Sequence, residues 1–255
     1  MRPTTTSAAS TLIAAALLAV SSSTATAAFS LVSDFEGLTA GSPLNGQGGW
    51  TVASNANSSV ETDPDDPGNL VGLLSATGGT SAIYHALGGG IANGTTGTLF
   101  FRARTTSAVN TNVGGSDVAT PTSGSFGDFE AQLRFGETDN ALDIRNGAAF
   151  QNDIGSYTDN IWFNYWLVID NTTDMTTFYQ SSGLDGAGDP LVTGAFRNGT
   201  TSAIDTFLVQ ANGAIYVDDV YIDTAGANLA NPIPEPSLLA LSLVGLGLLG
   251  LRRRR

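Results

Sequence analysis

The sequence contains no cysteine, no lysine and a single histidine among its 255 residues. Without cysteine there is no disulfide framework, no thiol catalysis and no thiolate zinc site. All ten basic residues are arginines, and they stand against 23 acidic residues, so the formal net charge is -13. Phosphate binding needs a clustered cationic surface, and we therefore expect no nucleic-acid partner. Hydrophobic residues reach 42%, which is too many for a disordered acidic tail.

Residues 1–27 predict a secretory signal peptide. Arg2 is the only charge before a short apolar stretch over residues 11–20, and Ala25-Thr26-Ala27 matches the small-x-small cleavage rule. This stretch is too short to cross a bilayer, which takes about 20 apolar residues. We expect signal peptidase to cut after Ala27, so that the mature chain begins near Ala28. A buried N-terminal helix is the alternative interpretation.

The C-terminal end combines three features in a fixed order. Alternating prolines over residues 232–236 keep the chain extended, a 15-residue apolar run covers 237–251, and an arginine cluster follows. As a helix the run rises about 22 Å. It therefore spans a bilayer core of about 30 Å only if the arginines snorkel or the bilayer thins. The arginines would keep the tail in the cytoplasm and the domain outside. The residues concerned are Pro232, Pro234, Glu235 and Pro236, then Arg252, Arg253, Arg254 and Arg255.

This arrangement resembles the PEP-CTERM sorting signal, with Pro234-Glu235-Pro236 as its motif. The resemblance covers residues 232–255. It implies that an exosortase, a membrane enzyme, recognises the chain and cuts it at the Pro-Glu-Pro site, so that contact with the membrane is transient. It also implies export through the inner membrane of a Gram-negative, exopolysaccharide-producing bacterium, to the cell envelope or the extracellular matrix. A generic single-span anchor is the alternative.

Residues 28–231 predict one all-β domain. Leaving out Arg2, Glu235 and the four terminal arginines, 22 acidic residues face five arginines, a net charge of -17. No convincing amphipathic helix is present, and short apolar runs alternate with Asn-Gly turn signals, which favours a two-sheet antiparallel jelly-roll sandwich. We expect 114–124 to form a surface loop. The expected strands are 29–35, 49–53, 70–75, 81–86, 98–105, 126–135, 141–145, 162–170, 176–180, 203–210 and 215–223.

The strand over residues 162–170 is the most informative. Alternation places Phe163, Tyr165, Leu167 and Ile169 on one face, which we expect to be core. The opposite face carries Trp162 and Trp166. It either packs under another sheet or a loop, or forms an aromatic platform that stacks on the apolar C–H faces of sugar rings.

Several segments along the domain form an ordered set. They are Asp34-Phe35-Glu36-Gly37, Asn45-Gly46-Gln47-Gly48-Gly49-Trp50, Leu99-Phe100-Phe101-Arg102, the hairpin 162–180 and Tyr216-Val217-Asp218-Asp219-Val220-Tyr221. This set resembles the concanavalin A-like lectin/glucanase superfamily, in its laminin G-like branch. The resemblance spans residues 29–223 and implies a lectin-like sandwich that binds carbohydrate. Jelly rolls of the galactose-binding type share the opening and closing patterns and are the rival topology.

No catalytic constellation is convincing. Retaining glucanases place paired carboxylates about 5–5.5 Å apart on one strand face. Residues 61–65 contain a proline and are expected to form a turn instead of a strand. Asp128 and Glu130 do share a face of an expected strand, but the third acid is missing, because Gln132 stands in its place. His85 lies on an apolar strand without a nucleophile elbow, and we interpret it as a satisfied structural histidine.

Calcium is the metal that this composition allows, because it takes six to eight oxygen ligands. The resemblance to secreted jelly rolls implies a structural calcium that joins the opening and closing strands, with Glu36 and Asp218 as ligands. The alternative is that Asp218 and Asp219 are charges that protect a sheet edge. Asp63, Asp65 and Asp66 are expected in a solvated loop.

Together these features predict an exported, non-enzymatic protein that adheres to or structures an exopolysaccharide matrix. No catalytic residue is assigned, and Trp162 and Trp166 are the candidate carbohydrate contacts. A glycan hydrolase or lyase on the same fold and a purely structural surface protein are the alternatives.

Overall fold

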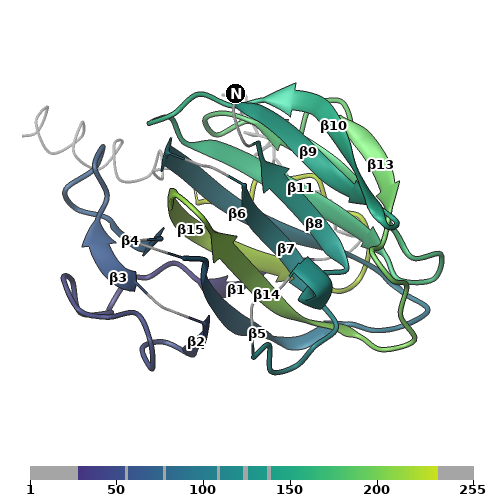
Figure 1. Ribbon diagram of the computed structural model, residues 1–255, viewed down its shortest axis with the longest axis horizontal. Coiled ribbons are helices and arrows are strands. Elements are labelled where there is room, and N and C mark those ends of the chain that lie inside the picture. The colour runs from purple at the N-terminus through teal and green to yellow at the C-terminus, as the bar shows by residue number, and fades with distance from the viewer. Residues whose placement is uncertain are drawn as a thin grey trace, which may run out of the picture.

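The computed structural model describes residues 28–54, 57–76, 79–107, 110–122, 126–136 and 139–234. Two antiparallel sheets pack face to face as a sandwich (Figure 1). The described part of the chain contains one short 3₁₀ helix, η1 (Phe126–Asp128), beside fifteen strands. The predicted all-β, two-sheet antiparallel architecture is confirmed.

One sheet, here the β6/β15 sheet, has eight strands in the order β13-β12-β11-β6-β15-β4-β3, with β1 also paired to β15. Because β1 pairs with β15, the first and last strands lie side by side. The strands of this sheet are β1 (Ser30–Ser33), β3 (Asn57–Thr62), β4 (Leu70–Ser75), β6 (Thr96–Ser107), β11 (Phe163–Asp170), β12 (Met175–Ser181), β13 (Val192–Ala195) and β15 (Ala214–Asp223).

The other sheet, the β7/β14 sheet, has seven strands in the order β10-β9-β8-β7-β14-β5-β2. Its members come from all parts of the chain, so both sheets depend on long-range pairing. The strands are β2 (Trp50–Ser54), β5 (Ser81–Ile91), β7 (Thr111–Ser116), β8 (Ala131–Phe135), β9 (Ala141–Asn146), β10 (Ala149–Ser156) and β14 (Ile204–Ala211).

The core lies between the sheets and is rich in aromatic rings. Tyr165 of β11 stacks on Phe101 of β6 at a centroid distance of 5.3 Å, and Phe101 in turn contacts Phe207 of β14. The predicted inward face of β11 is confirmed, because Tyr165, Leu167 and Ile169 are buried in this cluster and Phe163 packs against it.

Part of the predicted loop 114–124 is a buried strand. Residues 111–116 form β7, which pairs with β8 and β14 in the middle of its sheet. A Cβ atom at Gly114 would collide with the Ala131 carbonyl oxygen, and one at Gly115 would lie 2.7 Å from Ile204 Cγ2. The glycines that suggested a loop are therefore present because neighbouring atoms come close to the backbone.

Other expected boundaries also differ. β3, β10 and β13 were not expected, and the expected strand 126–135 begins only at Ala131. Residues 126–128 form η1 instead, so Asp128 and Glu130 do not share a strand face.

After β15 the chain turns back as a terminal strap, residues 224–234, over the outer face of the β6/β15 sheet. The Thr98 hydroxyl of β6 donates to the Gly226 carbonyl and accepts from the Asn228 amide. The Ala187 amide donates to the Leu229 carbonyl at 2.9 Å, which ties the strap to the loop after β12. The folded domain therefore includes residues close to the Pro-Glu-Pro motif.

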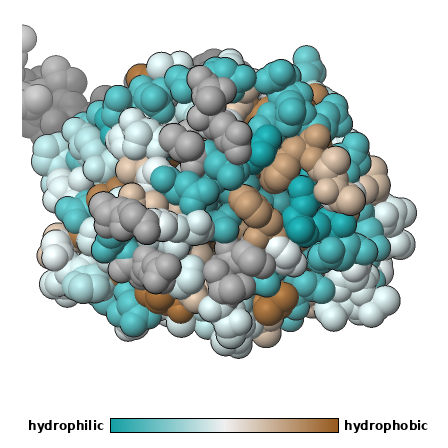
Figure 2. Space-filling model, in the orientation of Figure 1, coloured by the Kyte–Doolittle hydropathy of each residue, from teal (hydrophilic) through white to brown (hydrophobic). Residues whose placement is uncertain are grey.

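The surface is mainly polar. The face shown in Figure 2 is hydrophilic or neutral, with small, scattered hydrophobic patches. Of the large hydrophobic side chains in the described ranges, Leu31, Val118, Ile161 and Leu184 are exposed. None of the helices described is long and apolar enough to cross a membrane. Ala27, Glu235, Pro236, Arg252, Arg253, Arg254, Arg255 and the apolar run 237–251 lie outside the described residues.

Candidate functional site

The candidate site lies on the outer face of the β6/β15 sheet. Inward residues of β15 such as Val217 and Val220 belong to the core, so Tyr216, Asp218 and Tyr221 point outward. A shallow pocket of about 150 Å³ opens on this face. It is lined by Arg102 of β6, Trp162 and Asn164 at the start of β11, Gly183 and Leu184 of the loop after β12, and Ile233 of the strap.

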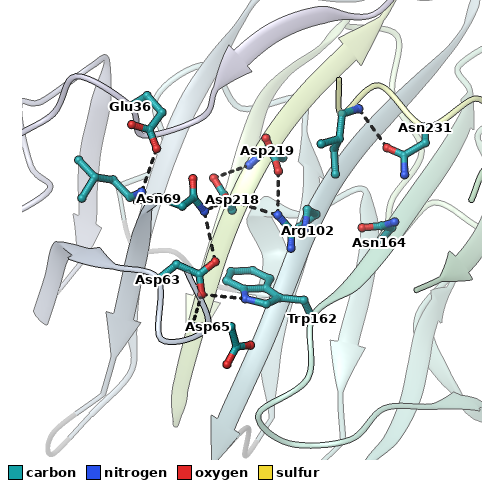
Figure 3. A network of polar contacts seen from close by, with 12 residues as sticks. Glu36, Asp63, Asp65, Asn69, Arg102, Trp162, Asn164, Asp218, Asp219 and Asn231 are labelled. Atoms are coloured by element: carbon teal, nitrogen blue, oxygen red, sulfur yellow. Dashed lines mark hydrogen bonds and ion pairs between the residues drawn. The ribbon is translucent and has the colours of Figure 1, made fainter. Parts of the chain in front are cut away.

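Trp162 is half-buried, and its position is fixed from two sides. Its indole Nε1–H donates to Asp63 Oδ1 at 3.1 Å, and the Arg102 guanidinium lies 4.8 Å from the ring centroid. In Figure 3 the indole lies between the Asp63 loop and Arg102. A cation over an indole face stabilises the pair and holds both groups in place.

Trp166 is not part of an exposed platform. It is fully buried, packs edge-to-face on Phe100 at 4.9 Å and donates its Nε1–H to the Ala230 carbonyl of the strap at 2.9 Å. The two tryptophans share a side of the β11 segment as predicted, but the strap covers the second one. The packing interpretation therefore holds for Trp166, and only Trp162 can contact a ligand in this arrangement.

A β-bulge brings two adjacent aspartates to the same cation. The register of β15 against β6 shifts between Asp218 and Tyr221, and Asp219 has a left-handed φ of 50°. Arg102 Nη1 lies 3.0 Å from Asp219 Oδ2 and 3.6 Å from Asp218 Oδ2. Strict alternation would have placed these side chains on opposite faces, and the bulge removes that alternation.

Burial changes the protonation of this pair. Asp218 is only 1% exposed, and desolvation, followed by the neighbouring Asp219, raises its pKa to about 8. Desolvation also raises the pKa of Asp219, against the lowering effect of Arg102. Because β15 is an inner strand, the edge-protection interpretation of Asp218 and Asp219 is wrong.

Asn69 joins Asp218 to the acidic loop. Its Nδ2 donates to Asp218 Oδ2 at 2.9 Å and to Asp63 Oδ2 at 3.2 Å. Asp63 is 4% exposed and therefore buried, contrary to the expectation of a solvated loop, whereas Asp65 and Asp66 are exposed as expected. Asp63 is held inside because it accepts hydrogen bonds from Asn69, Trp162 and the Asp65 amide.

The fold brings the two predicted calcium ligands to the same short segment. Glu36 Oε1 accepts from the Leu70 amide at 2.9 Å, and Asp218 contacts Asn69 one residue earlier (Figure 3). In the part of the chain that the structure describes, no group of three or more acidic or histidine side chains is placed to hold an ion. The Asp218 carboxylate faces the Asn69 amide and Arg102, an arrangement that does not fit calcium without rearrangement of Asn69.

The other singled-out residues have structural roles. The ring nitrogens of His85 lie 2.7 Å from the carbonyl oxygens of Ala86 and Gly48, and the protonated nitrogen donates to its carbonyl, which agrees with the expected structural role. Glu130 is buried, and its carboxylate accepts from Asn198 and from the Gly199 amide. Burial raises the pKa of Glu130.

Sequence reasoning missed Asn69, Asn164 and Ile233 as site residues, and gave no site role to Arg102. A signal existed for Arg102, because it closes the Leu99–Arg102 segment and alternates with the core residues Leu99 and Phe101. Ile233 gave no such signal, because only the return of the strap across the sheet brings it to the pocket.

Comparison with known proteins places the fold. No protein-family model and no curated protein matches the chain. Among solved structures, an endo-β-1,4-glucuronan lyase from Trichoderma reesei superposes with a TM-score of 0.51 and 14% identity, over 76% of this chain and 97% of that one.

Two further structures are similar at a lower level. The catalytic domain of a glycoside hydrolase family 131 protein from Coprinopsis cinerea gives a TM-score of 0.49 and 12% identity, covering 73% of this chain and 86% of the other. An alginate lyase from Aplysia kurodai gives 0.46 and 11%, with coverage of 64% and 86%. At 14% identity, the likeness to the Trichoderma reesei lyase shows a shared sandwich fold alone.

Proposed function

We propose that this chain is an exported, exosortase-sorted protein of the cell envelope or extracellular matrix that binds a neutral glycan without cleaving it. The observation that carries the proposal is the half-buried Trp162, fixed by Asp63 and Arg102 at the rim of an open pocket. The sandwich, which we assign to the concanavalin A-like kind, supports a glycan ligand in general, because the superposed lyase of Trichoderma reesei acts on a polysaccharide. That polysaccharide, a glucuronan, is anionic, so the preference for a neutral glycan rests on the charge of this chain.

The chemistry of the pocket suits one sugar ring. An indole offers an apolar face to the C–H side of a sugar and fixes its orientation, while the Arg102 guanidinium offers hydrogen-bond donors to hydroxyl groups. The pocket, about 150 Å³, is smaller than the roughly 300–1,000 Å³ usual for drug-sized ligands. It therefore fits a single ring or a chain end.

Charge favours neutral sugars. The domain carries far more carboxylates than arginines, and Arg102 is already paired with Asp218 and Asp219. An anionic polysaccharide would meet repulsion over most of the surface.

The position of the acidic residues supports a binding function more than an enzymatic one. Asp218 has the raised pKa of a general acid, which is the observation that favours a hydrolase or lyase as the second candidate. At 1% exposure, however, its carboxyl cannot reach a substrate in the pocket. Asp219 is bound to Arg102 instead of standing free.

The test is titration with cellohexaose, laminarihexaose and a uronic-acid oligosaccharide, with product analysis after long incubation. We expect binding of a neutral oligosaccharide without sugar release, and a loss of at least tenfold in affinity for Trp162→Ala. Tyr216→Ala is the matched control, because Tyr216 lies on the same face under Arg104 but outside the pocket. Sugar release supports the enzyme, and no binding of any probe contradicts the proposal.

A further inference from the structure

The strap supplies one wall of the pocket. Ile233 lines it together with Trp162 and Arg102, and the next residue, Pro234, begins the Pro-Glu-Pro motif. The part of the chain that reaches the sorting signal is thus also part of the candidate binding site.

Specific hydrogen bonds hold this part of the strap on the sheet. The buried Trp166 donates to the Ala230 carbonyl, and Asn231 Nδ2 donates to the Gly183 and Asp185 carbonyls at 3.4 and 3.3 Å. The Ile233 amide donates back to Asn231 Oδ1 at 3.0 Å, which turns the chain so that Ile233 meets the pocket. Asn164, itself a pocket residue, binds the same Gly183 carbonyl at 2.7 Å.

We propose that Ile233 is a specificity-determining wall of the glycan site, and that glycan binding is coupled to docking of the strap segment 228–233, which precedes the sorting junction. The proposal rests on the function proposed above. A sugar ring held between Trp162 and Ile233 contacts the pocket only while the strap is docked. A ligand that binds only the docked state stabilises it, and the coupling is reciprocal.

Two consequences follow for processing. A cut at or after Pro234 leaves the wall in place, and the released domain keeps a complete site. A cut before Ile233 removes the wall, and only a cut before Ala230 also removes the carbonyl that Trp166 binds. Bound glycan therefore protects the segment 228–233 from proteolysis.

The experiment compares four forms of the full-length protein in mild detergent: wild type, Trp162→Ala, Ile233→Ala and Ile161→Ala. Ile161 is the matched control, because it is an exposed isoleucine next to Trp162 that does not line the pocket. Affinity for cellohexaose and laminarihexaose is measured by calorimetry. Near-ultraviolet circular dichroism checks that the environment of Trp166 is unchanged.

We expect Ile233→Ala to weaken binding on the order of tenfold, because an apolar wall is lost from a small pocket, and Ile161→Ala to match wild type. We also expect saturating oligosaccharide to slow cleavage of residues 228–233 by a broad-specificity protease in wild type and not in Trp162→Ala. Wild-type affinity in Ile233→Ala, with weakened Trp162→Ala, overturns this inference and leaves the proposed function standing. Absence of binding to wild type overturns both.

Discussion

At the scale of single residues, Trp162 and Trp166 show how one strand face acquires two roles. They are four positions apart, about 13 Å along an extended strand, and both point away from the core. Trp162 is half-buried at a pocket, whereas Trp166 is sealed between Phe100 and the strap. The strap crosses the sheet over Trp166 and leaves Trp162 beside the pocket.

Alanine at these two positions should therefore have different effects. Trp166→Ala should lower the free energy of unfolding by about 3–5 kcal/mol, because it opens a large cavity. Trp162→Ala should lower the free energy of unfolding by clearly less and leave the fold intact. Urea unfolding of both variants measures this, with Trp166→Phe as a control that keeps a ring but removes the donor to Ala230. Equal losses would contradict the assignment of Trp166 to the packed interior.

Asp218 predicts a pH dependence of stability. Its pKa is raised to about 8 in the folded state, whereas an unfolded aspartate titrates near 4. The stability that its protonated form supplies is fully present below about pH 4 and is lost as the pH rises through about 8. The raised pKa values of Asp219 and Glu130 act in the same direction.

The measurement is the Tm of wild type and Asp218→Asn between pH 4 and 9. Wild type should lose stability over this range by up to about 1.4 kcal/mol per pH unit for one group. Asp218→Asn should show a shallower slope, because asparagine keeps the shape and does not ionise. Parallel curves for the two proteins would show that Asp218 does not titrate as described.

Calcium at Glu36 and Asp218 stays a prediction of the sequence. A bound ion would have to displace the Asn69 amide hydrogens from Asp218. If it binds, chelation should lower the Tm by several degrees, and Asp218→Asn should remove that response. An unchanged Tm after chelation contradicts calcium binding.

Part of the site could be predicted from the sequence, but its long-range contacts could not, and the reason is physical. Alternation was sufficient to place Trp162 and Trp166 outward, because a strand period is local. The strap contact to Trp166 joins residues 64 positions apart, and the Asn69–Asp218 bond joins residues 149 positions apart. Local patterns contain no information on such pairings.

At the scale of elements, β7 is a strand that its glycines led us to predict as a loop. Gly114 and Gly115 suggested a loop, yet both lie in a buried central strand where neighbouring atoms leave no room for a side chain. The bulge at Asp218 and Asp219 is a similar case, because an interrupted register redirects a side chain that alternation would place elsewhere.

Replacing Gly114 by alanine tests how closely the backbone of β8 approaches β7. The new Cβ would collide with the Ala131 carbonyl between β7 and β8, and we expect a loss of about 1–3 kcal/mol in unfolding free energy. Gly188→Ala is the control, because its Cβ would meet only the Gln180 carbonyl oxygen at 3.9 Å, and should change stability by less than about 0.5 kcal/mol. Equal, small effects would show that β7 and β8 can separate without cost.

At the scale of the whole molecule, the all-β composition, the turn signals and the missing helices were sufficient for the sandwich. The pairing of β1 with β15 agrees with the expectation that the opening and closing segments meet. The strand order was beyond prediction, because neighbours such as β6 and β15 are far apart in sequence. The predicted signals at the two ends carry no information on how the two sheets pack.

Export with trimming at both ends is the step on which the proposed biology depends. Intact mass of the native protein, taken separately from the cytosol, the envelope and the medium, tests it most directly. We predict a product outside the cytosol that begins near Ala28 and ends between Pro234 and Pro236, with Ile233 retained. A cytosolic chain that still runs from Met1 to Arg255 would contradict both the sorting and the extracellular role.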